Sequence, residues 1–215
     1  MQVFLLVIVG WIFSVCLHEF GHAFVAYRGG DYTVKDKGYL TFNPLHYTHP
    51  IYSLLLPVVF LLMGGIGLPG GAVYINDSLL RSRGWRTAVS LAGPAMNVGL
   101  IWLLSCLFWL GLVDANFGPA LAFLIELQIC AVILNLLPVP PLDGFRALSP
   151  WLPQEMTERL LANANIFMWG LFIALWYVAP VSRSFWGLTH SACVLLGIDP
   201  VLASDGWAEF QFWRR

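Results

Sequence analysis

Charged residues are scarce in this chain, and their scarcity defines its class. Asp, Glu, Lys and Arg make up 11% of its 215 residues, against about 25% in an ordinary soluble domain. Hydrophobic residues make up 59%. The composition therefore predicts an integral, multi-pass membrane protein in contact with the lipid bilayer. A formal net charge of −1 provides no basic surface for a phosphate backbone, which excludes nucleic acid as the main partner.

Cysteine is also rare, and no two of the four cysteines have a Cys-x-x-Cys spacing. Each lies in an apolar run, which is typical of small core residues and argues against disulfides or a thiolate metal site. The first ten residues contain no Lys or Arg and are not followed by a small-residue cleavage pattern. We therefore expect this segment to be retained in the protein.

Long apolar runs are abundant. A membrane-spanning helix needs about 20 mostly apolar residues, and four stretches satisfy this: 2–27, 86–112, 117–137 and 164–181. Two weaker runs are 51–68, which contains Pro57, and 185–198, which is short. We predict an all-α polytopic membrane protein with about five to six transmembrane helices. A re-entrant or β-like segment is expected between the first two of the four stretches.

Basic residues predict the orientation, because cytoplasmic loops are enriched in Lys and Arg. If 51–68 enters the membrane and returns on the same side, Arg183 is alone on one face. The other basic residues then share the opposite face: Arg28, Lys35, Lys37, Arg81, Arg83, Arg86, Arg146, Arg159, Arg214 and Arg215. A full crossing by 51–68 divides the basic residues less unevenly. We therefore predict an external N-terminus and cytoplasmic loops at 28–85 and 138–163.

The first apolar stretch contains the motif His-Glu-x-x-His, formed by His18, Glu19 and His22. On an α-helix, residues i and i+4 lie about 40° apart, so both imidazoles can bind one metal ion. Glu19 borders the same face, where a carboxylate can take a proton from a water molecule. A solvated helix surface is the alternative, but three ionisable groups within one membrane helix are costly unless they form a site.

A catalytic zinc site needs a third protein ligand. The stretch 117–137 is followed by three prolines and then by Asp143-Gly144. The prolines end the helix and direct Asp143 back toward the bundle. In the re-entrant arrangement, this stretch and the first one end at the same membrane face, so Asp143 can join the two histidines. The alternative is that Asp143 belongs to an ordinary Asp-Gly turn.

These motifs resemble those of the site-2 protease family of intramembrane zinc metalloproteases. The resemblance covers roughly residues 10–150 and includes Asn135 in the pattern Asn-x-x-Pro-x-Pro-x-Leu-Asp-Gly. The segments Gly38–Leu45 and Ala92–Asn97 are similar to segments of the short bacterial members. This family membership would imply one Zn²⁺ per chain, an active site toward the cytoplasm of a bacterial cell, and transmembrane proteins as substrates.

The resemblance also implies residue roles. His18, His22 and Asp143 would bind zinc, and Glu19 would be the catalytic acid/base. Asn135 would hold the substrate or its oxyanion. A substrate segment would add as an extra strand along the strand-like residues Ala72, Val73, Tyr74 and Ile75.

We therefore expect a zinc metalloendopeptidase that cleaves in or near the transmembrane segments of other membrane proteins. One domain would cover residues 1–215, with a catalytic core at about 1–150, C-terminal helices at about 159–198 and a tail at 199–215. With no regulatory domain in the chain, regulation would come from a separate protein, and the oligomeric state is open. A binding protein with a structural metal is an alternative that Glu19 disfavours, and a metal transporter would distribute its ligands along a path.

Five polar residues keep open interpretations. His49-Pro50 occurs where short family members usually have Asp-Pro, and His46 is nearby. These two histidines are either exposed or part of a second metal site. Glu126 lies in an apolar run, where we expect it to be protonated, or bonded within the bundle or near the outer headgroups. His190, on a short apolar run, is expected to be a packed or interfacial histidine. Asn97 either packs between helices or takes part in catalysis.

Overall fold

The computed structural model describes residues 2–43 and 73–214, and its regular secondary structure in these ranges is entirely helical. The α-helices are α1 (Gln2–Gly29), α2 (Thr33–Asp36), α4 (Arg83–Trp109), α5 (Gly118–Asn135), α6 (Asp143–Leu148), α7 (Gln154–Ala162), α8 (Ala164–Tyr177), α9 (Ala179–Leu195) and α10 (Pro200–Phe210). Short 3₁₀ turns are η3 (Asp77–Leu79), η4 (Ser149–Trp151) and η5 (Phe212–Arg214). The predicted all-α membrane fold is confirmed.

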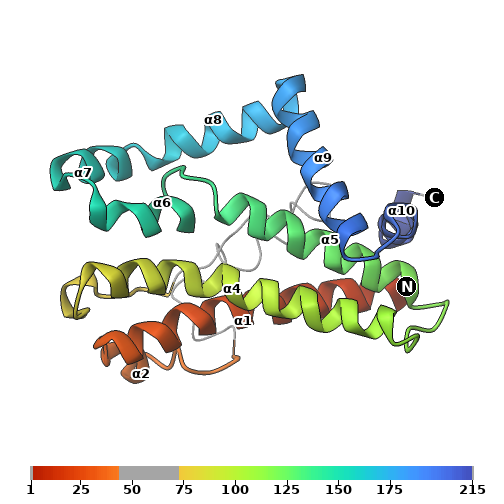
Figure 1. Ribbon diagram of the computed structural model, residues 1–215, viewed down its shortest axis with the longest axis horizontal. Helices are drawn as coiled ribbons and strands as arrows, with labels where there is room; N and C mark the ends of the chain where they lie inside the picture. Colours follow the sequence, from red (N-terminus) through yellow and green to blue (C-terminus); the bar gives the residue numbers. More distant parts are fainter. Residues whose placement is uncertain (1, 44–72, 215) are drawn as a thin grey trace.

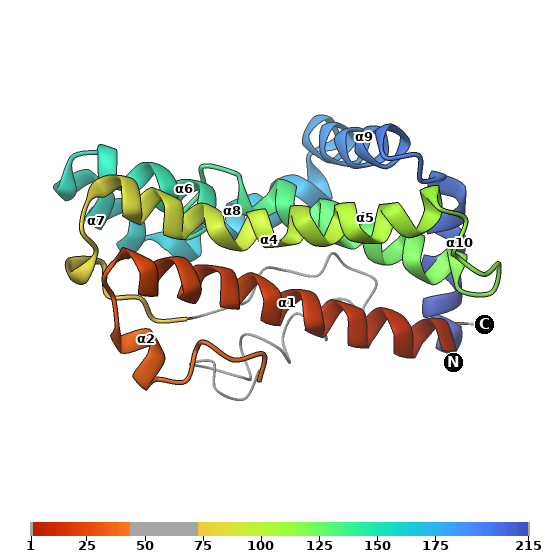
Figure 2. The same ribbon diagram turned by 60° about the horizontal axis from the view of Figure 1, so that its bottom comes forward.

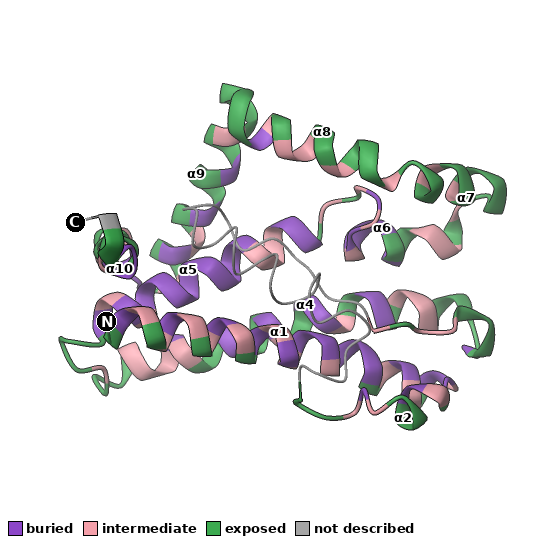
Figure 3. Ribbon diagram, turned by 180° about the vertical axis from the view of Figure 1, so that it is seen from behind, coloured by how far each residue is buried: buried purple, intermediate pink, exposed green. Residues whose placement is uncertain are grey.

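Helices α1, α4 and α5 form the centre of the bundle. They run side by side, with α4 antiparallel to the other two (Figures 1 and 2). Each is long and apolar enough to cross a membrane, as three of the four predicted spans require. Helix α5 is buried along most of its length (Figure 3), which explains why it is apolar on all sides.

The fourth predicted span, 164–181, is not one straight helix. Helix α8 ends at Tyr177, and Pro180 lies at the start of α9. Helices α7 and α8 together are long enough to cross a membrane but are bent by 64°, and α9 and α10 are bent by 114°. The described residues thus contain three to five candidate spans, which includes the lower part of the predicted range.

The predicted strand-like segment forms no strand in its described part. Val73, Tyr74 and Ile75 have no regular secondary structure, and a strand assignment requires a hydrogen-bonded neighbour that the described residues do not provide. Ala72 and the predicted re-entrant stretch 51–68 lie outside the described residues.

The C-terminal residues 199–215, predicted to be a tail, include helix α10. The ring of buried Phe210 stacks on the ring of Phe4, with centroids 5.2 Å apart. Trp213 contacts the Phe4 ring edge-on, with centroids 6.0 Å apart. The two chain termini therefore lie at the same end of the bundle (Figure 2). This corrects the predicted position of Arg214, which follows Trp213 and lies at the opposite end of the bundle from α2 and the start of α4. The chain bends by 114° between α9 and α10, and the contact of Phe210 with Phe4 keeps the following residues at this end.

Candidate metal centre

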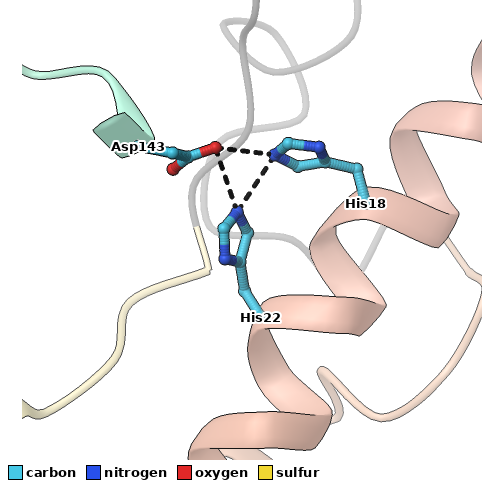
Figure 4. A group of neighbouring side chains, drawn as sticks. All are labelled: His18, His22 and Asp143. Atoms are coloured by element: carbon cyan, nitrogen blue, oxygen red, sulfur yellow. Dashed lines mark hydrogen bonds and ion pairs between the residues drawn. The ribbon is translucent and has the colours of Figure 1, made fainter. Parts of the chain in front are cut away.

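His18 and His22 of α1 meet Asp143, the first residue of α6 (Figure 4). The two Nε2 atoms lie 3.0 Å apart. Oδ2 of Asp143 lies 3.2 Å from Nε2 of His18 and 3.5 Å from Nε2 of His22. Tetrahedral Zn²⁺ with bonds of about 2.0 Å has ligand atoms about 3.3 Å apart. The three side chains are therefore spaced as ligands of one zinc ion, as the sequence predicts.

Asp143 is held in place by the packing of α6 on α4 and by the close approach of Gly144 to the residues that follow α5. A Cβ atom at Gly144 would lie 2.2 Å from the carbonyl oxygen of Leu136, so only glycine fits there. Asp143 thus belongs to a fixed helix start and not to an isolated Asp-Gly turn. Burial acts to raise the pKa of Asp143, but His22 and His18, when protonated, and their hydrogen bonds to the carboxylate lower that pKa well below its ordinary range. The carboxylate is therefore anionic, as a metal ligand must be.

Helix α4 approaches the two histidines at Gly93. A Cβ atom at this position would lie 2.3 Å from Nε2 of His22 and 2.5 Å from Nε2 of His18. Any side chain at this position would occupy the space in which the ligand atoms converge. The sequence includes Gly93 in a family-like segment but does not reveal this role, because no local pattern shows which residue of α4 faces α1.

The Nδ1 atom of His22 lies 2.7 Å from the backbone carbonyl oxygen of Val89. A carbonyl oxygen can only accept a hydrogen bond, so Nδ1 of the neutral ring carries the proton. Nε2 then presents its lone pair to the metal position. Such a bond fixes both the orientation and the tautomer of a histidine ligand.

A chain of buried hydrogen bonds orients His18 in the same way. Nδ1 of His18 lies 3.1 Å from Oδ1 of Asn97, whose amide donates to Oε1 of Gln128 at 3.0 Å. Gln128 donates to Oγ of Ser14 at 2.9 Å, and Ser14 donates to the carbonyl of Trp11 at 2.7 Å. The terminal carbonyl can only accept, which makes Asn97 the acceptor from His18. Asn97 therefore bonds to side chains of α1 and α5, as the packing interpretation expects, and it also positions a ligand.

Glu19 lies beside the metal-binding group without belonging to it. Its side chain is buried, and Oε2 accepts a hydrogen bond from the backbone N–H of Val73 at 3.2 Å. A carboxylate that is not a ligand keeps its lone pairs for a proton. This is the position that the sequence predicts for an acid/base.

A cavity of about 800 Å³ opens on the metal centre. Asn135, Val73 and Ile75, three of the predicted substrate-binding residues, line it. Tyr74 does not: its carbonyl accepts from Nζ of Lys37 at 3.1 Å, and the ammonium lies 4.6 Å from its ring centroid. Ala72, a further predicted residue, lies outside the described part of the chain.

Asp31 positions the segment that borders this cavity, a role the sequence does not reveal. The buried carboxylate accepts from the N–H and hydroxyl of Thr33, at 3.1 and 2.6 Å, and from the N–H of Asn76 at 2.7 Å. These bonds join residues 73–76 to the end of α1. The partner is 45 residues away in the sequence, so no local pattern could identify it.

The remaining polar residues of the sequence analysis lie apart from the metal centre. Glu126 of α5 pairs with His190 of α9, with Oε1 and Nε2 3.4 Å apart, which corresponds to the bundle-bonded alternative for Glu126. His46 and His49 lie outside the described residues. The metal-binding group that the described residues contain is thus the predicted one.

Near full-length relatives exist among known proteins, although no family model and no solved structure matches the chain. The "Putative zinc metalloprotease Rip2" of Mycolicibacterium smegmatis is 47% identical over 220 residues, which cover 98% of this chain and 82% of that protein. The Rip2 protein of Mycobacterium tuberculosis H37Rv is 44% identical over 213 residues with the same coverage. The "Putative zinc metalloprotease YwhC" of Bacillus subtilis is 29% identical over 189 residues.

Proposed function

The chain belongs to the site-2 protease-like family of zinc metalloproteases, and we propose that it hydrolyses peptide bonds in or near the transmembrane segments of other membrane proteins. One observation carries this proposal. His18, His22 and Asp143 converge within a bundle of membrane-length helices, and Glu19 lies beside them in the same cavity. A structural metal site has no need of a free carboxylate next to its ligands.

The chemistry divides between the cofactor and the side chains. Zn²⁺ held by His18, His22 and Asp143 supplies Lewis acidity to the scissile carbonyl and to a water molecule. Glu19 takes the proton from the attacking water and transfers it to the leaving amine. Asn135 lines the same cavity, and we infer that its amide donates a hydrogen bond to a substrate carbonyl.

Substrate binding requires local unwinding, because the carbonyls of a helical substrate are engaged in i to i−4 hydrogen bonds. Residues 73–76 are anchored by Glu19, Lys37 and Asp31. An extended substrate segment can pair with the backbone of such an anchored segment. Val73 and Ile75 line the cavity, which makes them the positions where we expect this pairing.

We propose that the metal centre faces the cytoplasm. The eight basic residues from Arg28 to Arg159 lie in or next to α2, α6, α7 and the adjacent ends of α1 and α4, at the end of the bundle opposite the termini. Single cysteines at exposed positions 36, 82 and 154, in a cysteine-free protein, should react with an impermeant reagent from the cytoplasmic side. A cysteine at position 213 should react from outside. Labelling of 36 and 82 from opposite sides would contradict the proposal.

The proposed activity is tested with purified wild type, Glu19→Gln and His22→Ala and a panel of single-span substrates. Wild type should contain one zinc per chain and cleave at least one substrate. Glu19→Gln should keep the zinc and lose cleavage by about 10²-fold or more, the scale for a removed general base. His22→Ala should lose the zinc. Near wild-type cleavage by Glu19→Gln would refute the mechanism, and zinc without any cleavage would favour a binding protein with a structural metal.

A further inference from the structure

Three arginines line the cavity of the metal centre toward its α7 end. Arg83 and Arg86 lie in the first turn of α4, and Arg146 lies in α6. Asp77 and Glu158 line the cavity as well, yet none of the three arginines forms an ion pair within the described part of the chain. The cavity wall thus carries three guanidinium groups that form no direct ion pair with a described carboxylate, although their charge is balanced overall by Glu19, Asp77 and Glu158.

Arg86 differs from a basic residue that only sets membrane orientation. Its Nε atom is buried and has no hydrogen-bond partner among the described residues. A guanidinium has five N–H donors and no acceptor, and a buried donor without an acceptor is unfavourable. Arg81 shows the contrast, because it is exposed and its guanidinium lies 6.0 Å from the ring of Trp85. The position of Arg86 therefore favours an acceptor that enters the cavity.

The helical repeat gives the distance between Arg86 and the metal centre. Arg86 and Gly93 are seven residues apart on α4, so they lie on nearly the same face and about 10 Å apart along the axis. Gly93 adjoins the two histidine ligands. An extended chain advances about 3.3 Å per residue. Arg86 thus lies about three substrate residues from the metal centre.

We propose that Arg86, assisted by Arg83 and Arg146, forms a subsite for an acidic side chain of the substrate, about three residues from the scissile bond on the α7 side. The proposal rests on the proposed function, because it concerns the same cavity. Cytoplasmic flanks of transmembrane segments are usually basic. The subsite repels such flanks and selects the minority of substrates that carry Asp or Glu, so it combines attraction with exclusion.

The first test is a charge scan of the single-span substrate that is cleaved best. A single Glu, Gln or Lys is introduced at successive positions of this substrate, and the cleavage site is mapped by mass spectrometry. Wild type should cleave the Glu substrate about tenfold faster than the Gln substrate at one position near the third residue, the scale of a charged hydrogen bond. Arg86→Gln should abolish this preference, and Arg86→Glu should transfer it to Lys. Arg81→Gln is the matched control and should keep the wild-type preference.

A binding measurement separates the subsite from the chemistry. In a Glu19→Gln protein, fluorescent single-span peptides in phosphatidylcholine vesicles should bind about tenfold more tightly with Glu than with Gln at that position. Adding Arg86→Gln should remove the difference. If the Glu peptide binds more tightly than the Gln peptide but wild type cleaves no substrate, the proposed protease activity is refuted and the subsite is retained. Equal binding of the two peptides refutes the subsite. The subsite is also refuted if Arg86→Gln weakens the binding of both peptides equally and does so only in vesicles that contain anionic lipids. Arg86 would then contact a lipid headgroup.

Discussion

The central helices α1, α4 and α5 and the peripheral helices α7 and α8 use side chains in opposite ways. In the centre, polar side chains are buried and bonded to one another, as in the chain from Ser14 to His18. On α8, Leu175 is the buried residue among those described, and large apolar side chains such as Trp169 are exposed (Figure 3). Because lipid is as apolar as leucine, burial of apolar surface does not bring membrane helices together. The polar contacts of the centre therefore specify how its helices pack, and they place the ligands at the same time.

If this contrast is correct, substitution of the central residues that bind, contact or orient the metal ligands should abolish or reduce metal binding, whereas substitutions on the lipid-exposed face of α8 should not. The expected effect depends on how directly a residue contacts the ligand atoms. Asp143 is a ligand, Gly93 adjoins the ligands, and Gln128 acts on His18 through Asn97.

Asp143→Asn should have the largest effect. Asn-Gly forms turns as well as Asp-Gly and the change is isosteric, so the start of α6 should persist. The metal position loses an anionic ligand, and zinc affinity should fall by more than the roughly 10- to 100-fold typical of a lost orienting residue. Cleavage should fall below detection. Zinc stoichiometry and cleavage are measured beside Asp36→Asn, a change at an exposed position of α2 that should be silent. Full zinc content and full activity in Asp143→Asn would show that Asp143 is not the third zinc ligand.

Gly93→Ala should have the next largest effect. The added methyl group would lie 2.3 Å from Nε2 of His22, so α4 must move away or the metal position is lost. A steric cost of about 1–3 kcal/mol corresponds to a loss of zinc affinity of up to about 100-fold. Gly99→Ala on the same helix is the matched control, because its Cβ meets nothing within 4 Å. Equal zinc affinity in the two variants would contradict the close approach.

Gln128→Leu should have a smaller effect, because Gln128 contacts the ligand only through Asn97. The amide of Asn97 loses its acceptor, and His18 loses a fixed tautomer. Zinc affinity should fall about tenfold, the lower end of the range for residues that orient ligands. The d–d spectrum of the Co²⁺-substituted protein should change as the geometry loosens. Ser105→Ala removes a buried hydroxyl outside this hydrogen-bond chain and should leave affinity and spectrum unchanged.

The metal ligands could be predicted from the sequence, because one local rule governs the histidine pair and another governs the position of Asp143. The i, i+4 spacing of His18 and His22 depends only on helix geometry, and the prolines before Asp143 end a helix wherever it packs. The topology argument then joined two segments that are more than a hundred residues apart. Membership in one family could be inferred from the same few residues.

The supporting residues could not be predicted, because their roles depend on which helix faces lie together. Gly93, Gln128 and Asp31 act on partners in other segments, and periodicity does not give the rotation of one helix against another. The charge count misplaced Arg214 because it treated 185–198 as a complete crossing. The bend between α9 and α10 and the packing of Phe210 depend on tertiary contacts.

The smallest effect is expected for Trp169→Ala on α8. The side chain is 65% exposed, and its ring contacts Phe172 of its own helix with centroids 6.1 Å apart. In a bilayer the removed surface is replaced by lipid, so little packing energy is lost. Zinc content and cleavage should remain within about twofold of wild type, the ordinary scale for a substitution away from any site.

Trp11→Ala provides the matched comparison, since it removes the same side chain from α1. Trp11 is 3% exposed, it lines the cavity, and its carbonyl ends the hydrogen-bond chain that orients His18. Loss of this side chain should leave a void beside Ser14, destabilise the protein by about 3–5 kcal/mol and lower cleavage through displacement of that chain. Zinc content, thermal unfolding and cleavage are measured for both variants in the same vesicles. Equal losses in the two would show that α8 contributes to the site as much as α1 does, and the division between centre and periphery would then be wrong.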